Sequence, residues 1–123
     1  MKTKLTTTLR VGRIRYVNTL PFYHGLAASL GRSGPELEFE SGTPSEVSRA
    51  LREGRIDMAP ISSIEYLHHQ DDYLLFPNLC IGARDFSASV LLLSRERVEG
   101  LNGATISLTE ESLSAAALAK ILL

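Results

Sequence analysis

The sequence contains very little cysteine and no tryptophan: Cys80 is the single thiol in 123 residues. One cysteine cannot form an intrachain disulfide, which excludes the small disulfide-stabilised folds common among secreted proteins. Because Cys80 lies in the apolar stretch LLFPNLCI, we expect its thiol to be buried and unreactive.

Net charge and long apolar runs are also lacking. Thirteen basic and fourteen acidic residues give a formal charge of -1, which does not favour binding to nucleic acid or to an anionic membrane. No apolar run has the length of a membrane span, and the N-terminus MKTKLTTTLR lacks the apolar segment of a secretory signal. We therefore expect a cytoplasmic protein whose partner is a small molecule.

The common cofactor and catalytic motifs are absent as well. The sequence has no G-x-G-x-x-G, no Walker glycine-lysine motif and no G-x-S-x-G nucleophile turn. His24, His68 and His69 do not have the spacing of a metal site, so we expect no metal.

What the sequence does contain is a regular alternation of strand-like and helix-like segments. Residues 9–16, 36–40 and 56–61 have the apolar patterns of strands, and helical spacing follows each of them. Further strand candidates cover residues 74–81, 89–93 and 103–108, before a final helical segment. This order predicts an α/β fold with a mainly parallel sheet flanked by helices.

The final helical segment stays apolar up to Leu123, with no glycine or proline after it. Such a helix needs further protein to cover its apolar side, so we expect a truncated chain. The expected organisation is an N-terminal tail at 1–8, a first α/β lobe at 9–98, and a crossover with the incomplete beginning of a second lobe at 99–123.

Hydroxyl-rich turns precede several of the expected helices. Thr43-Pro44-Ser45-Glu46 fits a capping box with Thr43 as the N-cap, and Ser62 begins a second S-x-x-E pattern. The corresponding residues at the other turns are Asn18, Thr19, Ser63 and Thr109, with Ser112 and Ser114 close behind Thr109.

Helix N-termini present unpaired N–H groups and the positive end of the helix dipole. Where such ends converge at the carboxyl edge of a parallel sheet, they form a crevice that suits a small anion. One turn by itself is explained more simply as a helix cap, so the prediction of a carboxylate site depends on several turns meeting.

Three stretches together resemble a known family: VNTLP at 17–21, GTPSEVSRALREGRIDMAPISSIEY at 42–66, and CIGARDFSASVLLLS at 80–94. They are similar to the chorismate dehydratases of menaquinone biosynthesis by the futalosine route, which share the type 2 periplasmic-binding-protein fold. The resemblance implies that chorismate is bound between two lobes and loses water to give 3-[(1-carboxyvinyl)oxy]benzoate. It implies no metal and no organic cofactor.

The resemblance also implies site residues. The family's active-site asparagine corresponds to Asn18, and its serine corresponds best to Ser89, with Ser87 as an alternative because the turn RDFS differs from the family pattern. These groups are neutral, so we hypothesise that the substrate's own enolpyruvyl carboxylate takes the ring proton. The predicted substrate-binding residues are Thr19, Thr43, Ser45, Ser62, Ser63, Ser87, Thr109 and Ser112.

Other functions remain open on the sequence. A solute-binding protein for a transporter or sensor would share the fold and the anion site. The sister family of the same pathway makes dihydroxynaphthoate, but its Cys-Pro-Asn-Asp opening is absent here. A non-catalytic fragment or interaction module is the third alternative.

Overall fold

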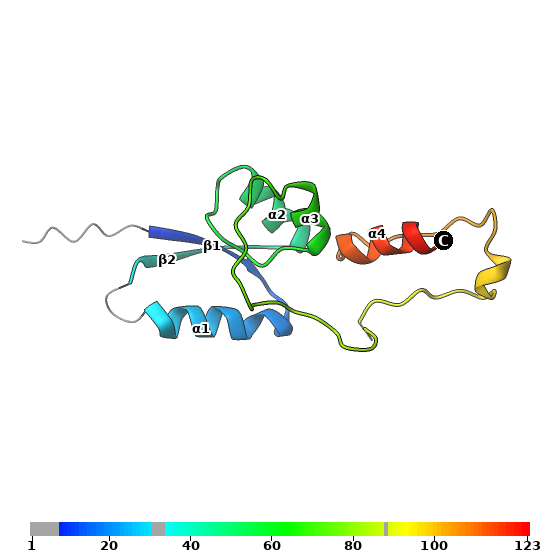
Figure 1. Ribbon diagram of the computed structural model, residues 1–123, viewed down its shortest axis with the longest axis horizontal. Coiled ribbons are helices and arrows are strands. Elements are labelled where there is room, and N and C mark those ends of the chain that lie inside the picture. Colours follow the sequence, from blue (N-terminus) through cyan, green and yellow to red (C-terminus); the bar gives the residue numbers. More distant parts are fainter. Residues whose placement is uncertain (1–7, 31–33, 88) are drawn as a thin grey trace, which may run out of the picture.

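A computed structural model describes residues 8–30, 34–87 and 89–123. Two strands, β1 (Thr8–Ile14) and β2 (Glu36–Gly42), pair in parallel, with Thr8 opposite Glu36 and Ile14 opposite Gly42. The helices are α1 (Leu20–Leu30), α2 (Pro44–Arg52), α3 (Ser63–His68) and α4 (Leu113–Leu122), with short 3-10 helices η1 (Val17–Thr19) and η3 (Val98–Gly100). Helix α1 lies on one side of the strand pair, and α2 and α3 lie on the other (Figure 1). The predicted α/β class with a parallel sheet flanked by helices is therefore confirmed.

The core lies between β1 and α2. Ile14, Val47, Ala50 and Ile56 are buried together, and Leu51 and Ala59 pack against them. The amphipathic spacing of α2 places Val47 and Ala50 on the side that faces the strands. Gly12 lets this layer approach β1 closely, because a Cβ there would lie 2.5 Å from Ile56 Cδ1 and 2.7 Å from Val47 Cγ1.

Helix α1 is held against the strands by Tyr23, which is buried. Its hydroxyl donates to the carbonyl of Gly12 at 3.2 Å and accepts the N–H of Ile14 at 3.0 Å. The ring also packs edge-on against Phe39 of β2, with centroids 6.0 Å apart. One side chain thus links α1 to both strands.

The predicted strand at 56–61 is shortened to a single parallel bridge between Val11 and Met58. The N–H of Gly12 donates to Met58 at 2.8 Å, and the N–H of Asp57 donates to Arg10 at 2.8 Å. Pro60 lies two residues after Met58 and has no backbone N–H. It therefore cannot donate the next hydrogen bond of a parallel ladder to β1.

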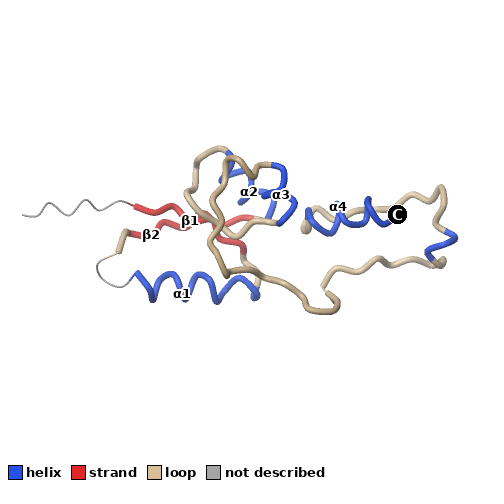
Figure 2. The backbone as a smooth tube through the Cα atoms, in the orientation of Figure 1, coloured by secondary structure: helices blue, strands red, loops and turns tan. Residues whose placement is uncertain are grey.

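The predictions of strands at 74–81, 89–93 and 103–108 are wrong for the described residues, which form loops there (Figure 2). A strand exists only with a hydrogen-bonded neighbour, and the described chain places none beside these segments. Most of their apolar side chains are exposed, with Leu74 98% and Leu93 85% accessible, and Ile106 is half-buried. Cys80 is also exposed, which corrects the expectation of a buried thiol.

Residues 1–7 of the predicted tail lie outside the described part, and Thr8 already belongs to β1. After α3 the chain makes a long excursion and returns so that α4 begins beside α3 (Figure 1). Among the described residues, no helix combines the length and apolar character needed to cross a membrane.

Candidate functional site

The start of α2 has the predicted capping box. The hydroxyl of Thr43 accepts the N–H of Glu46 at 3.3 Å, and the Glu46 carboxylate accepts the N–H and the hydroxyl of Thr43 at 2.8 and 3.0 Å. These hydrogen bonds from Thr43 hold the pKa of the Glu46 carboxyl below its ordinary value. The hydroxyl of Thr43 therefore caps α2. The hydroxyl of Ser45, two residues later, instead contacts another segment.

The start of α3 is capped by Ser62, whose hydroxyl accepts the N–H of Glu65 at 3.2 Å. The Glu65 side chain is only 6% exposed and accepts from Arg52 of α2 and, at 3.1 Å, from the Tyr73 hydroxyl. Burial, together with this hydrogen bond, raises the pKa of Tyr73 to about 12. The cluster ties α3 to the end of α2 and leaves Ser63 exposed at the helix start.

The start of α4 meets both of these helix starts. The Ser45 hydroxyl donates to the Glu110 carbonyl at 3.2 Å. The Ser63 and Ser114 hydroxyls lie 3.1 Å apart, and Ser114 also accepts the N–H of Ile64 at 3.4 Å. Residues fifty or more positions apart in sequence are thus in direct contact. The starts of α2, α3 and α4 meet at a junction formed by Ser45, Ser63, Glu110 and Ser114.

Two predicted residues of this terminal segment have local roles. Ser112 is the N-cap of α4 and accepts the N–H of Ala115 at 3.3 Å. Thr109 precedes the cap by three residues and accepts the N–H of Glu111 at 3.1 Å, which closes a turn. Thr109 is thus part of the approach to α4, and Ser112 lies at its start.

The segment after β1 joins the same junction through Tyr16, whose hydroxyl donates to the Glu111 carboxylate. Thr19 is 3% exposed, and its hydroxyl faces the carbonyls of Ile14 and Tyr16 at 2.8 and 2.7 Å. The hydroxyl of Thr19 is thus engaged with the main chain, and its predicted role in substrate binding stays a prediction. Asn18 is exposed in η1, and within the described residues its side chain makes no hydrogen bond.

Ser87 and Ser89 do not lie with these residues. Their hydroxyls are 3.0 Å apart on an exposed loop, and they line an open hollow of about 620 Å³ with Ile81, Gly82, Ala83 and Phe86. In Figure 1 this yellow-green to yellow part of the chain runs apart from the starts of α2, α3 and α4. The structure therefore gathers the predicted residues of three helix starts and leaves both candidate serines elsewhere.

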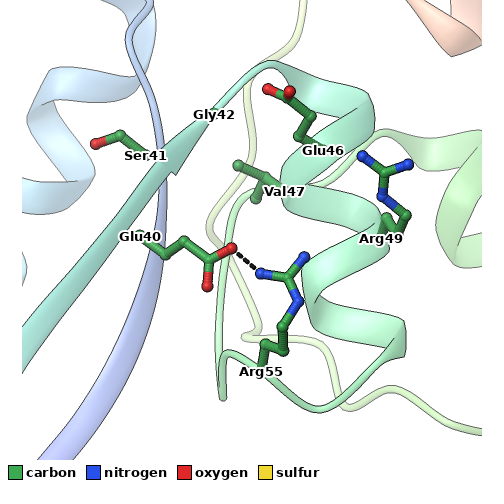
Figure 3. Close-up of a pocket in the computed structure, with 7 residues that line it drawn as sticks. All are labelled: Glu40, Ser41, Gly42, Glu46, Val47, Arg49 and Arg55. Atoms are coloured by element: carbon green, nitrogen blue, oxygen red, sulfur yellow. Dashed lines mark hydrogen bonds and ion pairs between the residues drawn. The ribbon is translucent and has the colours of Figure 1, made fainter.

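A second hollow, of about 200 Å³, lies beside β2 and α2 and contains none of the predicted ligand residues (Figure 3). Its lining residues are Glu40, Ser41, Gly42, Glu46, Val47, Arg49 and Arg55. Arg55 is paired with Glu40 and with Glu53, so its charge is already neutralised by the chain. The lining holds two carboxylates and two guanidinium groups, so it offers an anion no excess of positive charge.

Sequence reasoning assigned no role in the junction to Tyr16, Glu110, Glu111 or Ser114. Ser114 had a signal in the hydroxyl-rich segment TEESLS, but the spacing did not indicate which hydroxyl would face α3. Tyr16 ends an apolar-basic alternation that is typical of a strand, so its hydroxyl carried no separate signal. No three His, Cys, Asp or Glu side chains of the described ranges are grouped so as to hold a metal.

Comparison with known proteins decides the family. The family described as menaquinone biosynthesis matches residues 9–123. The chain belongs to this family. A curated relative named chorismate dehydratase comes from Thermus thermophilus and is 32% identical over 113 residues, which is 92% of this chain. The chain spans 39% of the length of that relative. No solved structure matches this chain.

Proposed function

We propose that this chain forms part of a chorismate dehydratase, which converts chorismate to 3-[(1-carboxyvinyl)oxy]benzoate and water. Membership of the menaquinone biosynthesis family and the 32% identity to a relative of that name support the reaction. The observation that carries the proposal is the gathering of the α2, α3 and α4 starts through Ser45, Ser63 and Ser114.

The proposal includes a two-lobed architecture of the type 2 periplasmic-binding-protein kind. Residues 9–98 would form the first lobe, and 99–123 would begin the second. The contacts of Ser45 with Glu110 and of Ser63 with Ser114 cross this boundary, so they fit a ligand site between lobes. A cytoplasmic location remains a prediction.

Chorismate carries two carboxylates, which suit hydroxyl donors at helix starts. The hydroxyl of Ser45 now donates to a neutral carbonyl, and a hydrogen bond to a carboxylate is roughly twice as strong as one between neutral groups. A substrate carboxylate would therefore compete well for Ser45 and for the Ser63–Ser114 pair. The dipoles of α2 and α4, which have nine and ten residues, add to this attraction.

The elimination needs little from the protein beyond positioning. The enolpyruvyl carboxylate takes the ring proton, the C–H electron pair forms the new ring double bond, and the ring hydroxyl leaves with that proton as water. Aromatisation supplies the driving force, so holding chorismate in one conformation is the main catalytic task. Asn18, exposed beside the junction at the end of β1, would orient the enolpyruvyl group.

Ser89, or its neighbour Ser87, would contact a substrate carboxylate or the departing hydroxyl. In the structure these serines are hydrogen-bonded to each other and not to the junction. This role therefore requires the loop at 82–93 to approach the helix starts when substrate binds. Asn18 needs no such movement, because it already follows directly after Tyr16 and Val17.

The test is an assay of the chain mixed with a second polypeptide, namely the part of the Thermus thermophilus relative that this chain does not cover. Chorismate is added, and the loss of one water is followed by mass spectrometry and by the absorbance of the new aromatic ring. Product formation supports the proposal. Chorismate binding without product would favour a solute-binding protein, and consumption of cyclised futalosine instead would favour the sister enzyme.

Single variants then assign the residues. Asn18→Ala and Ser89→Ala should lower turnover by about a hundredfold while leaving the folded fraction unchanged, with Ser87→Ala separating the two serines. Ser94→Ala is the matched control, because that hydroxyl only accepts the N–H of Glu96 in a local turn. Full turnover in both Asn18→Ala and Ser89→Ala would show that these roles are wrong.

A further inference from the structure

A carboxylate of the chain itself already occupies the junction where the substrate is proposed to bind. The Tyr16 hydroxyl donates to Glu111, across 95 positions of sequence. Tyr16 lies directly before η1, and Glu111 lies directly before Ser112, the N-cap of α4. The contact therefore joins the end of β1 to the start of α4.

The surroundings of Glu111 make this contact easy to exchange. The side chain is exposed, and within the described residues no Lys or Arg forms an ion pair with it. Its partner is a neutral phenol that is 40% exposed. The hydrogen bond to Glu111 raises the pKa of Tyr16, which favours the protonated phenol that acts as the donor.

The same short segment makes the other junction contacts. The carbonyl of Glu110 accepts from Ser45, and the hydroxyl of Ser114 faces Ser63. The Glu111 carboxylate held by Tyr16 thus belongs to the same short segment that contacts the starts of α2 and α3. An acidic side chain in this position imitates an anionic ligand, because a ligand carboxylate could accept the same hydrogen bond from the Tyr16 hydroxyl.

We propose that Tyr16 binds a carboxylate of the substrate, and that Glu111 is an internal substitute that the substrate displaces. The inference rests on the proposed function and names a binding residue and a competitor within that site. It assigns opposite effects to two side chains in contact: the phenol contributes to affinity and the acid opposes it.

These opposite effects provide the test. Tyr16→Phe removes the donor and should weaken chorismate binding about tenfold, the effect of losing one hydrogen bond to a charged group. Glu111→Gln removes the competing charge and its repulsion and should strengthen binding about threefold to tenfold. Glu36→Gln is the matched control: it makes the same charge change at the amino end of β2, whereas the junction lies at the carboxyl end, and should leave affinity unchanged.

Affinity is measured by isothermal titration calorimetry on the chain and each variant, with folding checked by circular dichroism. Isophthalate, an unreactive aromatic dicarboxylate, serves as a second probe. Weaker binding by Glu111→Gln, or unchanged binding by a folded Tyr16→Phe, would overturn the inference. If Tyr16→Phe does not fold, the affinity of Glu111→Gln for chorismate, compared with that of Glu36→Gln, still tests the inference.

The two proposals fail differently. If the wild-type chain binds isophthalate but not chorismate, the proposed function fails, and the variants still test Tyr16 with isophthalate. If it binds chorismate while Glu111→Gln and Glu36→Gln behave alike, the function stands and the inference fails. If neither probe binds, both are overturned.

Discussion

Replacing Gly12 by alanine tests whether the contact between β1 and α2 is the core of this chain. A Cβ at position 12 would lie 2.5 Å from Ile56 Cδ1, 2.7 Å from Val47 Cγ1 and 2.8 Å from Ala59 Cβ. Two of these atoms are ends of side chains that can shift, but the Ala59 Cβ is fixed to the backbone. Gly12→Ala therefore requires the layer at 56–59 to move away from β1.

Overpacking of this kind typically costs about 1–3 kcal/mol. Alanine restricts the unfolded chain more than glycine does, which returns roughly 0.5–1 kcal/mol. Because three contacts below 3 Å occur together, we expect a net loss of about 2 kcal/mol. That loss corresponds to a fall in melting temperature of roughly 10 °C.

Gly25→Ala is the matched control. Gly25 lies in α1, and a Cβ there would meet nothing within 4 Å. The same chemical change should therefore stabilise the chain by about 0.5–1 kcal/mol, as expected for glycine to alanine inside a helix.

Urea unfolding followed by circular dichroism measures both variants. A third variant, Gly12→Ala with Ile56→Val, removes the nearest atom, Ile56 Cδ1, and should recover part of the loss relative to the sum of the single changes. Equal stability of Gly12→Ala and Gly25→Ala would refute the assignment of this core, and additive effects at Gly12 and Ile56 would refute the contact.

Two further predictions concern side chains with defined partners. Thr43→Ala should lower the free energy of unfolding by about 1 kcal/mol through loss of the capping box, while Thr43→Ser should retain most of it; urea unfolding that ranks both variants equally would argue against the cap. Tyr73 has a pKa raised from 10.0 to about 12, so its contribution to stability is complete below pH 10 and is lost as the pH rises through 12. The difference in unfolding free energy between wild type and Tyr73→Phe should therefore shrink over that pH range, and a constant difference would contradict the environment described for Tyr73.

Local signals in the sequence were sufficient for the helix starts. The capping box at Thr43 and the cap at Ser62 involve groups three residues apart, so spacing alone determines them. The alternation at 9–16 and 36–40 likewise identified β1 and β2, since a strand with one buried side shows a period of two. The fold class followed from the order of these segments.

The segments at 74–81 and 89–93 show where local signals fail. An apolar run reports that side chains favour burial, but a strand also needs a neighbouring strand to accept its hydrogen bonds. In the described chain the sheet consists of β1 and β2 with a bridge at Met58, and the later runs lie elsewhere with side chains such as Leu74 exposed. The apolar pattern was real, but the partner that would turn it into a strand was not encoded in the run itself.

The junction separates these two kinds of information within one site. Ser45 and Ser63 could be predicted because they lie two residues and one residue after the recognisable caps Thr43 and Ser62. Their partners, Glu110 and Ser114, could not, because two of many hydroxyl and carbonyl groups are selected only when α4 packs beside α3. The same packing places Glu111 against Tyr16, and the sequence distinguishes neither residue from its neighbours. The Ser45 and Ser63 hydroxyls are therefore placed by helix starts that local sequence specifies, whereas tertiary packing brings together Tyr16 and the acid that would compete for it.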